Sequence, residues 1–167
     1  MKLVLKLSII AVFSVSILLA SCSAEKSSAE FPPSCTESGF TYEDNNLVLN
    51  EATSDENVYL INNSSASQIM INIPPKKDPG ADAGWSSMLG ANKWSAIAIS
   101  TENFKFSCYN LPSSGGEENL NCKEVLSVCK FKQADLGSAG SGSFWLAEDK
   151  PLNGILATMK SRGVSWE

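Results

Sequence analysis

The strongest constraint on the fold is a strict two-residue alternation of side chains between residues 67 and 73. Three isoleucines, Ile69, Ile71 and Ile73, fall on one side of this segment, and the residues between them fall on the other. A repeat of two is the period of a β-strand, so this segment is predicted to be a strand with one buried face. Further short strands, separated by turn-forming residues, are predicted at 46–50, 57–63, 94–100, 103–109 and 143–147.

Residues 122–132 allow two interpretations. Cys122, Val125 and Cys129 recur with helical spacing, whereas Val125 and Val128 in a chain otherwise made of strands also suit a β-segment. We favour a strand here.

The end of the chain has a different pattern. Leu152, Ile155 and Met159 recur with helical spacing, so an amphipathic helix is predicted over this segment. Pro151 suits its first turn and Gly163 suits its termination. We expect this single helix to cover one edge or end of a sheet.

These segments together predict a mainly β fold, either an antiparallel β-sandwich or a barrel-like sheet, with one C-terminal amphipathic helix. The isoleucines of residues 67–73 and the phenylalanines of residues 104–108 are expected to meet inside with Phe144 or Trp145.

The first 22 residues predict export. Lys2 and Lys6 precede an apolar run over residues 8–20, which is too short to span a bilayer comfortably and matches a secretory signal. The following Leu-Ala-Ser-Cys, ending at Cys22, resembles the lipobox of bacterial lipoproteins. That resemblance implies a cut before Cys22, acyl chains on its thiol, and a lipid-anchored place in the cell envelope, with Ser23 consistent with the outer membrane. The alternatives are an ordinary signal peptide with a chance cysteine, or a short membrane anchor.

The chain then divides into three expected parts. Residues 1–21 are a lipoprotein signal peptide, and residues 22–34 are a flexible tether rich in Ser, Ala, Glu, Lys and Pro. Residues 35–167 form one disulfide-stabilised β domain.

Four cysteines remain once Cys22 is set aside. An even number of cysteines in an exported protein indicates two disulfides, and four cysteines allow three pairings. We favour Cys108 with Cys122, across a hairpin, and Cys35 with Cys129. A zinc site or a redox centre is disfavoured because the gaps are long and no Cys-x-x-Cys occurs.

Composition argues against several functions. Removal of residues 1–21 takes away Lys2 and Lys6, which leaves 11 basic and 18 acidic side chains and a formal charge of −7. An acidic domain is a poor ligand for nucleic acid. The chain has no histidine, so it lacks the usual proton shuttle and the commonest metal ligand. We therefore expect no enzyme, no metal site and no cofactor.

Trp85, Trp94 and Trp145 are the candidate binding residues. They could form an aromatic surface for a glycan or a protein, or they could cover the end of the core, which is the interpretation that we favour for Trp85 and Trp94. The long connections at residues 74–93 and 110–121 are the expected contact surfaces.

Two segments resemble the enhanced-entry protein B family of Legionella-type bacteria: Gly-Ala-Asp-Ala-Gly-Trp at residues 80–85 and Asn-Lys-Trp-Ser-Ala at residues 92–96. The resemblance covers most of residues 35 to 164 and carries no catalytic signature. That family is associated with entry into host cells, through small exported envelope proteins. The later residues that carry it are Phe106, Cys108, Glu117, Cys122, Val125, Val128, Cys129, Phe144, Trp145, Arg162 and Gly163.

The sequence therefore predicts a non-enzymatic, envelope-anchored lipoprotein that acts as a binding or adaptor module for an envelope or host protein, with the resemblance pointing to host-cell entry. One alternative is an inhibitor of a wall-cleaving hydrolase such as lysozyme, because an acidic domain suits a basic enzyme. Another is a glycan-binding module that uses the tryptophans.

Overall fold

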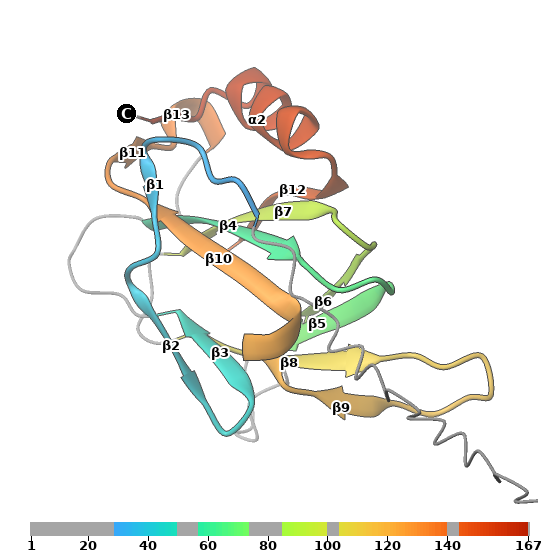
Figure 1. The fold of residues 1–167 in the computed structure, drawn as a ribbon. Helices are drawn as coiled ribbons and strands as arrows, with labels where there is room; N and C mark the ends of the chain where they lie inside the picture. The colour runs from blue at the N-terminus through green and yellow to red at the C-terminus, as the bar shows by residue number, and fades with distance from the viewer. Residues whose placement is uncertain (1–28, 50–56, 74–84, 100–103, 140–143, 167) are drawn as a thin grey trace, which may run out of the picture.

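A computed structural model describes residues 29–49, 57–73, 85–99, 104–139 and 144–166 of the chain. Figure 1 shows two antiparallel sheets facing one another, with a helix over the far side of one of them. This mainly β architecture with one longer helix near the C-terminus confirms the fold class expected from the sequence.

The first sheet contains five strands in the order β1-β10-β4-β7-β12, all antiparallel. Its central strands, β4 and β7, come from segments whose apolar patterns predicted strands, and they pair from Asn57 opposite Ile99 to Asn62 opposite Trp94. The strands are β1 (Cys35–Thr36), β10 (Leu126–Phe131), β4 (Asn57–Asn63), β7 (Trp94–Ile99) and β12 (Phe144–Lys150).

The second sheet has the order β2-β3-β8-β5-β6, with β9 also paired to β8. The β2–β3 hairpin turns at Asp44 and Asn45, whose φ angles of 47° and 67° are those of the tight turn that joins antiparallel strands. Its strands are β2 (Phe40–Glu43), β3 (Asn46–Leu49), β8 (Phe104–Asn110), β5 (Ile69–Ile73), β6 (Trp85–Leu89) and β9 (Glu118–Leu120).

Four short elements and one longer helix complete the described residues. The short elements are a helical turn, α1 (Cys122–Val125), a 3₁₀ turn, η1 (Gly137–Ala139), and a small ladder of β11 (Ala134–Asp135) with β13 (Ser165–Trp166). The longer helix is α2 (Leu152–Ser161), at the position that the sequence predicted.

The described residues form two hydrophobic cores because both faces of the first sheet are covered. The core between the sheets contains the inward isoleucines Ile69 and Ile71 with Phe106, and Trp145 packs against it. The second core lies between the first sheet and α2 and includes Ile155 and Met159. The predicted meeting of isoleucines, phenylalanine and Trp145 is therefore confirmed.

Strand β7 shows how one segment serves both cores. Ile97 and Ile99 point into the core between the sheets, whereas Ala96 and Ala98 point into the core beneath α2. Small alanines leave room for a helix to approach the sheet closely. The alternation of large and small side chains thus assigns each face of the strand its neighbour.

Both disulfides have the pairing that we favoured. Cys35 bonds to Cys129 with a Cα–Cα distance of 5.5 Å, and Cys108 bonds to Cys122 with a Cα–Cα distance of 5.4 Å. The first joins edge strand β1 to β10, so it ties the start of the domain to a late strand.

Two expectations about segments need correction. Residues 122–132 contain both of the structures that their pattern allowed, because α1 is followed directly by β10. The connection at residues 74–93 contains strand β6, which pairs with β5 along its whole length from Ile69–Leu89 to Ile73–Trp85. Its sequence, Trp-Ser-Ser-Met-Leu, shows no clear alternation because Ser87 is on the buried face and Met88 on the exposed face.

The expected tether also ends earlier than residue 34. Ala29 and Phe31 pack against the core beneath α2, and the Phe31 ring meets Trp94 edge to face at a centroid distance of 5.9 Å. The amide of Lys132 donates to the carbonyl of Ser34 at 3.2 Å. Residues 29–34 are thus part of the domain, held there by contacts that the composition of residues 22–34 as a whole did not indicate. The expected signal and Cys22 lie outside the described residues.

Candidate functional site: a disulfide-stapled hairpin

The most prominent surface feature among the described residues is the hairpin of β8 and β9, whose tip projects beyond the second sheet (Figure 1). The paired residues run from Cys108 opposite Leu120 to Asn110 opposite Glu118. Residues 111–117 form the tip that joins the two strands, and all of them except the half-buried Pro112 are exposed. The tip lies within the connection at residues 110–121 that the sequence analysis proposed as a contact surface.

The tip contains one large apolar side chain. Leu111 is 40% exposed and is one of the two exposed large hydrophobic residues in the described part of the chain. Gly115 and Gly116 follow at φ angles of 88° and 92°, which residues with a Cβ rarely adopt. A Cβ built at either glycine would meet no atom within 4 Å, so the tip stands clear of the domain.

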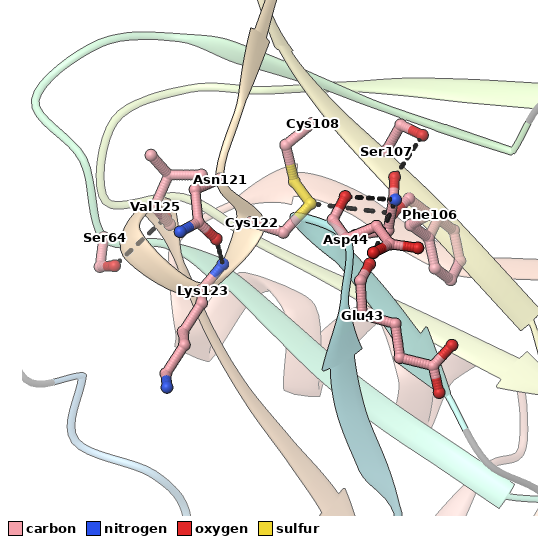
Figure 2. The surroundings of a disulfide bond; sticks show 11 residues. Glu43, Asp44, Ser64, Phe106, Ser107, Cys108, Asn121, Cys122, Lys123 and Val125 are labelled. Atoms are coloured by element: carbon pink, nitrogen blue, oxygen red, sulfur yellow. Dashed lines mark hydrogen bonds between the residues drawn. A yellow bond between two sulfur atoms is a disulfide. The ribbon is translucent and has the colours of Figure 1, made fainter.

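The base of the hairpin is closed by the Cys108–Cys122 disulfide (Figure 2). Both cysteines are fully buried. Asn121 caps the helical turn that follows: its side-chain oxygen accepts from the amide of Lys123 at 3.1 Å, and its side-chain nitrogen donates to Glu124 Oε1 at 3.1 Å. The amide of Cys122 also donates to the carbonyl of Asn45 at 2.8 Å. The returning strand is therefore tied to the β2–β3 turn.

Further hydrogen bonds hold the base from two sides. The Ser107 hydroxyl donates to Asn46 Oδ1 at 2.7 Å, and Asn46 Nδ2 donates to the carbonyl of Asp44 at 2.8 Å. On the other side, the Ser64 amide donates to the carbonyl of Val125 at 2.9 Å. Figure 2 shows Asp44, Ser107, Ser64 and Val125 around the disulfide. The hairpin thus combines a fixed base with an exposed tip.

The hairpin is acidic. Between Asn110 and Cys122 the only charged residues are Glu117 and Glu118, and both are exposed. Asn110 Nδ2 donates to Glu118 Oε2 at 3.2 Å, which places that carboxylate beside the first strand. Near these carboxylates, cationic groups of a partner would be attracted and anionic groups repelled.

Two of the three candidate tryptophans contact the hydrophobic cores. Trp94 is only 6% exposed and belongs to the core beneath α2, so its ring has no free face to offer a glycan. Trp145 is half-buried and packs against Phe106 with a centroid distance of 5.9 Å. Trp85 lies in β6, but its side chain lies outside what the structure describes. Trp94 thus lies in a core, as in the interpretation that we favoured for it, and Trp145 packs against the core between the sheets.

A second outward surface, on the second sheet, was not predicted from the sequence. Tyr109, Met70 and Met88 lie directly opposite one another on β8, β5 and β6. Their strand neighbours Cys108, Ile71 and Leu89 are buried, so these three side chains are on the outward face. The alternation in β5 indicated that Met70 would face outward. Its neighbours could be identified only from the strand register.

The described residues contain no group of three or more histidine, cysteine, aspartate or glutamate side chains placed to hold a metal ion. In the same part of the chain, no helix has the length and apolar character needed to cross a bilayer.

Comparison of the chain with protein-family models, with curated proteins and with solved structures gives no match.

Proposed function

We propose that this protein is a non-enzymatic lipoprotein of the cell envelope, whose β domain acts as a binding or adaptor module and contributes to host-cell entry. The observation that carries the proposal is the β8–β9 hairpin, with a disulfide-closed base and an exposed tip. Recognition is commonly carried by loops that a rigid scaffold positions. The resemblance to the enhanced-entry family supports the biological setting, and the lipobox ending at Cys22 supports the anchor.

Binding at the hairpin would use two kinds of contact. Leu111 supplies an apolar anchor at the centre of the contact, where removal of water strengthens binding. Glu117 ends the tip and Glu118 begins β9, and both favour a partner with basic groups at the rim of the contact. The disulfide limits the conformational freedom that the loop must lose on binding.

The binding proposal is tested by co-purification of the full-length protein from detergent-solubilised envelopes and from lysates of host cells. Leu111→Ser is combined with Glu117→Lys, and the matched control is Glu148→Lys, an exposed carboxylate of β12. A partner that is retained by the wild type and the control but lost by the hairpin variant supports the proposal. A partner that the hairpin variant retains at full yield contradicts it.

The anchor is tested separately. Cys22→Ser is expected to move the protein from the membrane fraction to the soluble fraction, because the thiol that receives the acyl chains is absent. Intact-mass measurement of the wild type should show the added lipid. An unacylated wild-type protein would contradict the anchor and leave the hairpin proposal standing.

A second candidate function is inhibition of a basic wall-cleaving hydrolase such as lysozyme, and the specific observation that favours it is the acidic hairpin tip. The full-length protein, added in molar excess to lysozyme acting on cell walls, should slow hydrolysis. Glu117→Gln with Glu118→Gln should relieve this effect. Unimpaired hydrolysis at high excess would remove this function.

A further inference from the structure

Met70 and Met88 form a cross-strand pair on the outward face of the second sheet. They are directly opposite in the antiparallel register of β5 and β6, where facing Cβ atoms lie about 4.5–5.5 Å apart. Met88 is 38% exposed and Met70 is half-buried. Both thioethers are therefore on the side of the sheet that meets solvent, and Tyr109 is the next residue across from Met70.

The third methionine of the described residues is in a contrasting environment. Met159 is fully buried in the core beneath α2, beside Ile155. An oxidant can reach its sulfur only when the helix opens away from the sheet. The same chain thus holds exposed and protected thioethers, and comparison of the two gives an internal control.

The cysteine sulfurs in the described part of the chain are already bonded to one another. Its four cysteines, Cys35, Cys108, Cys122 and Cys129, are joined in two disulfides. No free thiol in this part of the chain competes for an oxidant, so the thioethers are the next sulfur groups to react.

We propose that Met70 and Met88 are a surface site of reversible oxidation by peroxides or hypohalous acids. With hydrogen peroxide, the methionine sulfur attacks one oxygen, the O–O bond breaks, and a sulfur–oxygen bond forms. The sulfur is oxidised by two electrons and the peroxide is reduced. The departing hydroxide takes the proton of the transferred oxygen and leaves as water. Methionine sulfoxide reductases return the sulfoxide to the thioether with two electrons and two protons from a dithiol, which becomes a disulfide, and the oxygen leaves as water.

The position of the pair determines what oxidation does to the protein. A sulfoxide is polar, so its formation inside a core disrupts packing. Met70 and Met88 face outward, and water can solvate their sulfoxides without any change in the cores. Oxidation of the pair therefore makes this face polar while the domain stays folded. The site consumes oxidant before Met159 is reached.

The test exposes the full-length protein to hydrogen peroxide and follows each methionine by peptide mass spectrometry after quenching. Met88 should be oxidised at least about ten times faster than Met159, with Met70 between them. The near-ultraviolet circular dichroism and the melting temperature should stay unchanged while only the pair is oxidised. Methionine sulfoxide reductase should then restore the original masses.

Two variants test whether the oxidation rate of each methionine follows its exposure or follows a general unfolding of the domain. Met88→Leu should remove the fastest oxidation phase, whereas Met159→Leu should leave that phase unchanged. Oxidation of Met159 at the same rate as Met88 in folded protein would overturn the proposal. Unfolding that accompanies oxidation of Met70 and Met88 would overturn it as well, as would sulfoxides that the reductases cannot reduce.

Discussion

At the scale of single residues, Asn63 illustrates how a buried polar side chain determines the path of the chain. It is fully buried at the end of β4, where its Nδ2 donates to the carbonyls of Ser67 at 2.7 Å and Leu89 at 2.8 Å. Its Oδ1 accepts from the amide of Ser65 at 3.0 Å. One amide group thus joins the turn after β4 to the end of β6, and it satisfies the buried carbonyl of Leu89.

Replacement of Asn63 by alanine should lower the free energy of unfolding by about 2–4 kcal/mol, because buried backbone groups lose their partners. Equilibrium unfolding in urea measures the change. Gln68→Ala, at an exposed position of the same turn, should alter stability by less than about 0.5 kcal/mol. Equal effects of the two substitutions would refute this role of Asn63.

The half-buried side chain of Tyr42 makes a contribution to the free energy of unfolding that depends on pH. Desolvation by burial, and then the negative charge of Glu37, raise the pKa of Tyr42 from 10.0 to about 12. The raised pKa means that the folded protein holds the phenolic proton more tightly than the unfolded chain does. The resulting stability is present in full below pH 10 and is lost as the pH rises to about 12.

The free energies of unfolding of wild type and Tyr42→Phe are therefore expected to diverge between pH 10 and about 12, with the wild type losing more. Urea unfolding across this range measures the difference, and ultraviolet absorbance follows tyrosinate formation. A pH-independent difference between the two proteins would show that the pKa of Tyr42 is ordinary.

At the scale of elements, the stability of helix α2 depends on the hydrogen bonds at its C-terminal end. Gly163 has a φ angle of 84°, its amide donates to the carbonyl of Lys160, and the next amide, of Val164, donates to the carbonyl of Met159. These bonds satisfy carbonyl groups of the last helical turn that have no donor within the helix. The turn brings Gly163 against Ser138 of η1, so β13 can pair with β11.

Gly163→Ala should destabilise the protein by about 2–4 kcal/mol, since a strained φ angle adds to a steric clash. The new Cβ would press on the Ser138 side chain and lie 3.1 Å from its amide nitrogen. Gly115→Ala is the matched control: its φ angle is 88°, but a Cβ there meets no atom within 4 Å. That variant should lose only about 1–2 kcal/mol. Equal losses in thermal unfolding would show that the contact with Ser138 is unimportant.

At the scale of the whole molecule, two disulfides act over different lengths of chain. Cys35–Cys129 spans a sequence separation of 94 residues and holds β1 against β10, whereas Cys108–Cys122 spans 14 residues and closes a single hairpin. A crosslink that closes a longer loop removes more conformational freedom from the unfolded chain.

Loss of the Cys35–Cys129 bond, in the double variant with alanine at both positions, should cost about 4–5 kcal/mol. Loss of the Cys108–Cys122 bond should cost about 3 kcal/mol and also reduce binding by the hairpin. Urea unfolding of both double variants under non-reducing conditions gives the comparison. A larger loss from the shorter loop would contradict the entropic explanation for this protein.

Local patterns predicted much of the fold because strands and amphipathic helices leave a period in the sequence. The isoleucines of β5 and the spacing of Leu152, Ile155 and Met159 identified those elements directly. The four cysteines that remain once Cys22 is set aside indicated two disulfides, and the exposed connection around residues 111–117 followed from its glycines and serines.

Strand β6 and the packing of residues 29–34 could not be read in this way, because pairing partners and a neighbouring ring hold them in place. The same is true of the tryptophans. A tryptophan that binds a ligand and one that fills a core are the same letter in a sequence. Only the position of Trp94 beneath α2 decided between these two roles. The sequence determined which segments could be strand, helix or turn. The tertiary structure decided which faces are covered, because burial depends on neighbours that are distant along the chain.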